Sequence, residues 1–119
     1  MGSELEEARA CIFKIHTAQQ QGLQQVIIEG DCLALIMKLR KKQRPTGNVG
    51  RLVDDILKLS SNFNFCAFSF VKRNGNKIAH ALAHLKLYVS SPRVWFKDGP
   101  DYVFVLVLDD LRYRLEVNQ

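Results

Sequence analysis

The first 22 residues carry an apolar pattern with helical spacing. Ser3 and Glu6 form a capping-box pair, and Gly22 provides a stop signal at the other end. The positions predicted to share the buried face are Leu5, Ala8, Ile12 and Ile15. The pattern therefore predicts that the chain opens with an amphipathic helix.

Two more helices are predicted between residues 31 and 60. Asp31 is placed to cap the first of them, and the segment Arg44-Pro45-Thr46-Gly47 ends it. The second covers residues 49–60. The apolar face of the first carries Cys32, Leu35, Ile36 and Leu39, and that of the second carries Leu52, Ile56 and Leu59.

Two buried strands alternate with these helices. Residues 26–28 are a β-branched run between polar flanks, and residues 63–71 are rich in aromatic and β-branched side chains. A turn at Asn74-Gly75-Asn76 leads to a fourth helix. The inner stripe of that helix is Ile78, Ala81, Leu82 and Leu85. Because a crossover separates the strands, we expect residues 26–29 to pair in parallel with part of 65–71.

This element order predicts an α/β fold with a short, mostly parallel sheet packed by helices. Two strands are few for such a sheet, which suggests that its partner strands are missing. Residues 101–108 have strand-like composition behind a proline, and the pattern leaves a strand and a short helix both open.

Composition and charge limit the class of protein. The chain has 119 residues, 47% of them hydrophobic, and a net charge of +5, which is globular composition compatible with a polyanionic partner. No run approaches the roughly 20 apolar residues of a membrane span. Glu4, Glu6 and Glu7 near the start are unlike a secretory signal, so we expect a nuclear or cytoplasmic protein that is not secreted. The three cysteines lie in apolar stretches and are predicted to be free thiols.

The densest charge feature is a basic run at the predicted end of the second helix. It comprises Lys38, Arg40, Lys41, Lys42 and Arg44. One interpretation is a solvated helix end that the helix dipole favours, and the other is contact with phosphates. His80 and His84 have a spacing that suits a transition metal, but no third ligand stands at motif spacing, so an exposed polar face is favoured.

Three blocks of sequence, in order, carry a family resemblance. The first is Glu7-Ala8 in a helix that ends at Gly22-Leu23, and the second is the strand with its following Glu29-Gly30-Asp31. The third is the segment from Val71-Lys72-Arg73-Asn74 to Ala83. Together they resemble the ribonuclease H-like domain of the reverse-transcriptase-like family, of the plant, retroelement-derived type.

The resemblance implies chemistry for particular residues. The family cleaves the RNA strand of RNA–DNA hybrids with two Mg²⁺ (or Mn²⁺) ions held by four carboxylates. Glu7 and Asp31 match two of these carboxylates and are the implied catalytic and metal-ligating residues. We expect them to approach each other at the C-terminal end of the first strand, with His80 nearby. The family's last aspartate falls at His80, which is therefore the third implied catalytic residue, although imidazole is a poorer partner for Mg²⁺ than a carboxylate. The family's other aspartate, which bridges both metal ions, has no counterpart here, so two of the four carboxylates remain and we expect an impaired acidic site. On the residues alone, Glu7 also reads as a solvated helix glutamate and Asp31 as a plain cap.

The resemblance also implies a truncation and a binding surface. The family's domain begins with three antiparallel strands that have no counterpart here, so we expect residues 1–90 to be the C-terminal part of a ribonuclease H-like domain and 91–119 a C-terminal extension. The residues expected to bind nucleic acid are Lys38, Arg40, Lys41, Lys42, Lys72, Arg73, Asn76 and Lys77. RNA–DNA hybrid or RNA is the expected partner, with no membrane and no small-molecule cofactor.

The sequence features and the resemblance together lead to two hypotheses of function from different classes. The first is a nucleic-acid-binding domain of the RNA–DNA hybrid ribonuclease (endonuclease) lineage in which cleavage is impaired. The second is a non-enzymatic remnant or protein-interaction module that keeps the helices for packing.

Overall fold

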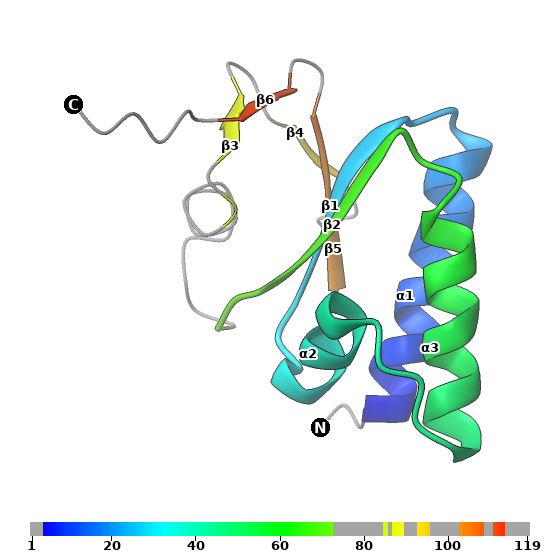
Figure 1. Cartoon of the computed structure of the whole chain (residues 1–119). Coiled ribbons are helices and arrows are strands. Elements are labelled where there is room, and N and C mark those ends of the chain that lie inside the picture. Colours follow the sequence, from blue (N-terminus) through cyan, green and yellow to red (C-terminus); the bar gives the residue numbers. More distant parts are fainter. Residues whose placement is uncertain are drawn as a thin grey trace.

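The structure is a computed structural model that describes residues 4–72, 85, 87–89, 93–95, 103–108 and 111–113. The three helices lie in the first part of these residues, with β1 between α1 and α2, and the strands β2 to β6 follow α3 (Figure 1). The elements are α1 (Glu4–Gln20), β1 (Gln25–Gly30), α2 (Leu33–Lys41), α3 (Gly47–Ser60), β2 (Phe65–Phe70), β3 (Leu87–Val89), β4 (Arg93–Trp95), β5 (Val103–Val107) and β6 (Leu111–Tyr113). The α/β class predicted from the sequence is confirmed.

The central pair of strands is parallel, as the crossover through α2 and α3 requires. Gln25 of β1 lies opposite Phe65 of β2, and the register continues to Gly30 opposite Phe70. The predicted parallel pairing is therefore confirmed. Because β1 is buried on both faces, its central residues 26–28 are all apolar rather than alternately apolar and polar.

The sheet is mixed, and the expectation of a mostly parallel sheet is wrong. Its order is β2-β1-β5-β4, and a separate pair is formed by β3 and β6. β5 runs antiparallel to β1, with Val103 opposite Gly30 and Val107 opposite Val26. β4 in turn is antiparallel to β5. The segment that the pattern left open between strand and helix is thus a strand, and it supplies the neighbour that β1 needed.

The three described helices pack on one side of the sheet (Figure 1). β1 directs Val26 and Ile28 into the core that they share with α1, α2 and α3. Ile27 occupies the alternate position and is buried as well. The helices contribute Ala8, Cys11, Ile15, Ala18, Leu35, Ile36, Leu39, Val53 and Ile56 to this core. Leu5 and Ile12, predicted to face it, are only half-buried, because the buried stripe of α1 is centred on Cys11.

Two helices end in Schellman motifs. At the end of α1, Gly22 has φ +77°, and the Leu23 amide donates to the Ala18 carbonyl, which confirms the predicted stop. At the end of α2, Lys42 has φ +56°, and the Gln43 amide donates to the Lys38 carbonyl. A lysine in this left-handed conformation is uncommon, and it turns the basic run away from the helix axis.

The helix starts differ in part from prediction. The residue that caps α2 is Cys32, so the predicted capping role of Asp31 is off by one residue. α3 starts at Gly47, two residues before the predicted start. Gly50 in its first turn is buried against the chain, since a Cβ there would lie 1.3 Å from the Pro45 carbonyl oxygen. That close approach explains how α3 begins immediately after the proline segment.

Some predictions fall outside the described residues. These are the Ser3 cap, the turn at 74–76 and most of the fourth helix, of which Leu85 is described and helical. The division at residue 90 stays a prediction, although β4 and β5 lie in the same sheet as β1 and β2. None of the described helices has the length and apolarity to cross a membrane.

Candidate functional site

Glu7 is a buried carboxylate on the first turns of α1. Only 3% of its surface is exposed, so its interpretation as a solvated helix glutamate is wrong. Its negative charge contributes to raising the pKa of Cys32, after burial of that thiol, which is the larger cause. Glu7 therefore lies within electrostatic reach of the residue that follows Asp31.

Asp31 follows β1 directly, at the carboxyl end of the parallel pair. This is the edge where α/β sheets place ligands. The side chain is half-buried, and β5 starts beside it because Val103 is the partner of Gly30. Asp31 therefore lies next to Cys32, the residue whose pKa the charge of Glu7 raises. Direct approach of the Glu7 and Asp31 carboxylates stays a prediction. His80 lies outside the described residues.

The donor atoms of Glu7 and Asp31 are of the kind that Mg²⁺ takes, because hard cations prefer carboxylate oxygens. Two such ligands are fewer than a protein magnesium site with two ions needs. Among the described residues, no group of three histidine, cysteine or acidic side chains is placed to hold a metal. The implied magnesium site therefore stays a prediction.

Two buried charged residues near this region were missed by the sequence reasoning. Lys14 is two turns after Glu7 on α1, and its ammonium donates to the backbone carbonyl of Val103 in β5. Glu29 is fully buried in β1. The spacing of Lys14 from Glu7 and Cys11 was the available signal, since it places all three near one helix face. For Glu29, the signal was its place inside a strand predicted to be buried on both faces.

The basic run separates into residues with different surroundings. Lys38 pairs with Glu4, which ties α2 to the start of α1. Arg40, Lys41 and Lys42 at the end of α2 are exposed. The helix dipole favours cations at that end, so the solvated interpretation and the phosphate-binding interpretation are compatible for these three.

The remaining predicted nucleic-acid-binding residues lie after β2. Lys72 is exposed directly beyond the buried Val71. Arg73, Asn76 and Lys77 fall outside the described residues. Their part in a common surface with α2 stays a prediction.

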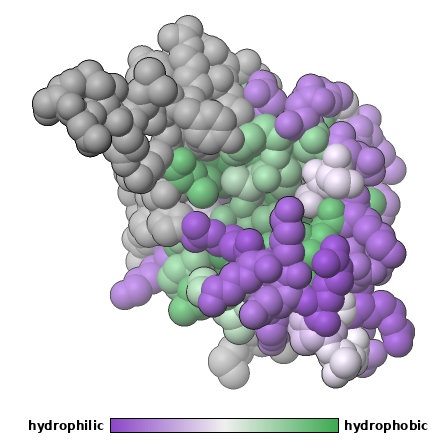
Figure 2. Space-filling model, in the orientation of Figure 1, coloured by the Kyte–Doolittle hydropathy of each residue, from purple (hydrophilic) through white to green (hydrophobic). Residues whose placement is uncertain are grey.

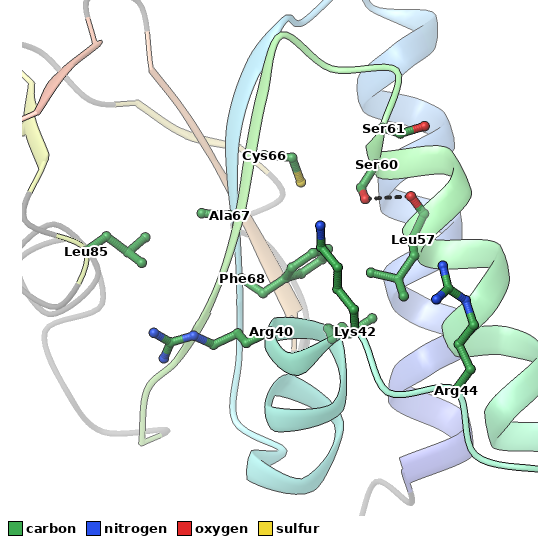
Figure 3. Close-up of a pocket in the computed structure, with 11 residues that line it drawn as sticks. Arg40, Lys42, Arg44, Leu57, Ser60, Ser61, Cys66, Ala67, Phe68 and Leu85 are labelled. Atoms are coloured by element: carbon green, nitrogen blue, oxygen red, sulfur yellow. Dashed lines mark hydrogen bonds between the residues drawn. The ribbon is translucent and has the colours of Figure 1, made fainter.

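A pocket of about 540 Å³ lies between the ends of α2 and α3 and strand β2 (Figure 3). Among the described residues that line it, three are cationic, namely Arg40, Lys42 and Arg44. Its other lining residues include Leu39, Leu57 and Phe68, which are apolar, and Ser60, Ser61 and Cys66. Figure 2 shows the same contrast over this face, with an apolar area bordered by hydrophilic residues.

Polar contacts hold the wall of the pocket formed by α3. The Ser60 and Ser61 hydroxyls donate to the Leu57 and Lys58 carbonyls. The Arg44 Nε donates to Asp54 Oδ1 over 2.7 Å. Hydrogen bonds from Lys58 and then Arg44 lower the pKa of Asp54, so this carboxyl is ionised at neutral pH.

The one cysteine that lines the pocket is neutral at physiological pH. Burial raises the pKa of the Cys66 thiol to about 12. Figure 3 shows Cys66 directed from β2 toward Ser60, with Lys42 extending from the end of α2 toward the same wall. Sequence reasoning found the cations but not the pocket, because β2 meets α2 and α3 only in the folded chain.

Comparison with known proteins identifies the family. The sequence model described as "Reverse transcriptase-like" matches residues 1–86, which is 86 of the 119 residues. The chain belongs to the reverse transcriptase-like family. Its domain is therefore of the RNase H-like, nucleic-acid-related kind. Searches of curated proteins and of solved structures gave no match.

The matched region of this reverse transcriptase-like chain contains some of the features described above and excludes others. It includes Glu7, Asp31, the basic run and the described lining residues of the pocket. Strands β3 to β6 begin at Leu87 and lie beyond it. The strand β5 that pairs with β1 is thus supplied from outside the matched region.

Proposed function

We propose that this domain binds nucleic acid, with RNA–DNA hybrid or RNA as its partner, and that the chain by itself cleaves hybrid poorly or not at all. The observation that carries the binding part is the exposed cationic end of α2, formed by Arg40, Lys41 and Lys42, in a member of a nucleic-acid-related family. Phosphate contacts supply most of the affinity in such proteins. A-form duplexes are recognised by shape and 2′-hydroxyls rather than by base sequence.

The cleavage part rests on the acidic residues. Glu7 and Asp31 occupy positions that the resemblance assigns to carboxylates, and His80 occupies a third. Imidazole is a poor ligand for Mg²⁺ compared with a carboxylate. When bound, Mg²⁺ would supply electrostatic stabilisation of the reacting phosphate oxygens, with Glu7 and Asp31 as the residues that hold it. An incomplete set of carboxylates predicts weak binding of the metal ion. We also propose that the chain comes from the plant, retroelement-derived branch of the family.

A hybrid cleavage assay with Mg²⁺ or Mn²⁺ tests this proposal, with hybrid binding measured on the same samples. We expect the wild-type chain to bind hybrid. We expect it to release no more cleavage product than the Asp31→Asn variant does. His80→Asp alone should not restore cleavage, because one further carboxylate does not complete the set. Robust Mg²⁺-dependent cleavage that Asp31→Asn abolishes would contradict the proposal.

One observation favours the second candidate, a protein-interaction module. Leu33 and Met37 lie one turn apart on α2 and are 52% and 37% exposed. Single exposed apolar residues are common on soluble proteins, so this patch carries less weight than the basic surface. Hybrid binding that is absent at low salt would shift the assignment to this candidate.

A further inference from the structure

Strand β2 lies at one edge of the described part of the sheet. In the order β2-β1-β5-β4, its neighbour is β1 alone. At the two ends of β2, the Phe65 amide donates to the Gln24 carbonyl and the Val71 amide donates to the Gly30 carbonyl. Because consecutive residues of a strand direct their amide and carbonyl groups to opposite sides, the odd-numbered residues from 65 to 71 face β1.

The even-numbered residues of β2 therefore present their backbone groups at its outer edge. These residues are Cys66, Phe68 and Phe70, and no described strand pairs with them on that side. The sequence of β2 carries no charge and no proline, and its register with β1 has no bulge. Those are the features with which proteins usually prevent pairing at an edge. Figure 2 shows apolar residues in the middle of the face on which Figure 1 shows β2, so the outer edge is suited to accept a further strand.

The pocket beside α2 and α3 opens onto this edge. The consecutive residues Cys66, Ala67 and Phe68 all line it, although alternate side chains of a strand lie on opposite faces of a sheet. Figure 3 shows Cys66 directed toward α3 and Ala67 directed to the other side, where Leu85 lies. The pocket thus extends across the edge of β2 and reaches both faces of the sheet. An extended peptide has a matching form, with side chains that alternate on either side of its backbone.

We propose that the outer edge of β2 binds an extended acidic peptide segment of a partner protein, which adds to the sheet as a further strand. The proposal does not rest on nucleic-acid binding. In this mode of recognition, main-chain hydrogen bonds supply the affinity, and contacts with alternate side chains supply the specificity. Leu57 and Leu85 line the pocket from opposite sides of β2 and are the apolar contacts for those side chains.

Charge favours an acidic peptide over a second copy of this chain. Lys42 is exposed and lines the pocket, and Figure 3 shows its side chain extending toward the wall formed by α3. Arg44 is already paired with Asp54, so Lys42 is the cation that carries this argument. Two copies paired edge to edge would bring together two such lysines and two chains of net charge +5, and like charges repel. A carboxylate of an acidic peptide instead forms a charge-assisted hydrogen bond with Lys42.

Hydrogen exchange measured by NMR on the full chain tests the edge directly. In the free chain we expect the amides of Cys66, Phe68 and Phe70 to exchange about tenfold faster than those of Ala67 and Ser69, which face β1. A six-residue peptide of alternating valine and glutamate should slow the first three amides about tenfold and leave the other two unchanged. Exchange of all five amides at one slow rate in the free chain would show that the edge is already covered, and would overturn the proposal.

Two modified peptides control for attraction by charge alone. Each carries N-methyl groups on one alternate set of its amides, which removes hydrogen-bond donors and keeps every carboxylate. Because only one edge of an added strand faces β2, we expect one isomer to bind about tenfold more weakly and the other to bind as the parent peptide does. Fluorescence anisotropy with labelled peptides measures these affinities. Equal binding of the parent and both isomers, or no binding of the parent, would overturn the proposal.

Two substitutions form a matched pair in the protein. Lys42→Asn removes the pocket lysine and keeps a residue type that tolerates the positive φ at this position. Lys41→Gln removes the neighbouring exposed lysine, which is not among the lining residues. We expect Lys42→Asn to weaken binding of the acidic peptide about threefold to tenfold, and Lys41→Gln to change it less than about twofold. Equal effects of the two substitutions would overturn the assignment of the acidic side chain to Lys42.

The outcomes also separate this proposal from the proposed function. RNA–DNA hybrid that slows exchange of the outer amides of β2, where the peptide does not, would assign the edge to nucleic acid and overturn the peptide proposal. Peptide binding in a chain that binds no hybrid would support the peptide proposal and contradict the proposed function.

Discussion

At the residue scale, the buried charged residue Lys14 connects the first helix to the sheet. Lys14 is 5% exposed, and its ammonium donates to the Val103 carbonyl, which links α1 to β5. A buried lysine is rare unless it is paired. Lys14 and Glu7 are both buried on α1, so this face of the helix belongs to the packed interior.

We expect Lys14→Ala to lower the free energy of unfolding by about 1–3 kcal/mol, because it removes a buried hydrogen bond and leaves a gap. Arg9→Ala is the matched control, since Arg9 is exposed on the same helix. Urea denaturation of both variants checks this. Equal, small effects would show that the Lys14 contact contributes nothing to stability.

The thiols provide a second prediction at this scale. Burial raises the pKa of Cys11 and of Cys66, the latter to about 12, and burial is also the largest cause of the rise at Cys32. At pH 8 we expect iodoacetamide to modify Cys32 fastest and Cys11 slowest, because the thiolate is the reactive form. Peptide mass spectrometry measures the order. Native-state labelling of Cys11 at its denatured rate would contradict it.

The same shifts set a pH dependence of stability. A thiol has an ordinary pKa of about 8.5 when the chain is unfolded. The unfolded state therefore loses its protons first as the pH rises, and stability that is fully present below about pH 8.5 should fall toward pH 12. Substituting Cys66→Ala should reduce this alkaline loss.

At the element scale, the outcome shows what sequence patterns can and cannot predict. The helices and the parallel pair β1–β2 follow from local periodicity and from the crossover, so they were predictable. The antiparallel β5 was not, because its partner β1 lies more than 70 residues earlier and no local signal specifies that pairing. The mixed sheet is a consequence of this distant contact.

The candidate site was predictable to a similar extent. Asp31 was placed at the end of β1 by the strand pattern, and the basic run was visible as charge. The burial of Glu7 and the pocket were not predictable, because both depend on which elements meet. The i,i+7 spacing shows that Glu7 and Lys14 lie near one face of the helix, but only packing shows that this face is buried.

We expect β5 to stabilise the same cooperative unit as β1. Leu106 is fully buried opposite Ile27, so Leu106→Ala should cost about 2–5 kcal/mol. Leu33→Ala, at an exposed position, is the control. Thermal unfolding should show one transition shifted by the first substitution. A second, separate transition for the C-terminal strands would contradict the shared sheet.

At the scale of the whole molecule, two regions divide the surface of the domain. One is the end of β1, which Asp31 follows, and the other is the basic end of α2 with its pocket. That Glu7 approaches Asp31 there stays a prediction. Binding depends on distributed charge and tolerates the loss of single residues. Catalysis by metal ions depends on a complete ligand set. Binding can therefore persist where cleavage does not.

The salt dependence of RNA–DNA hybrid affinity tests the central claim most directly. Because bound phosphates release counterions, log Kd should rise steeply with log salt, by about 0.7–0.9 per phosphate contact. We expect the triple variant Arg40→Gln, Lys41→Gln, Lys42→Asn to bind weakly and to lose about two to three contacts from the slope. Arg9→Gln should keep the wild-type slope. Hybrid affinity that is insensitive to salt, or unchanged in the triple variant, would contradict the account.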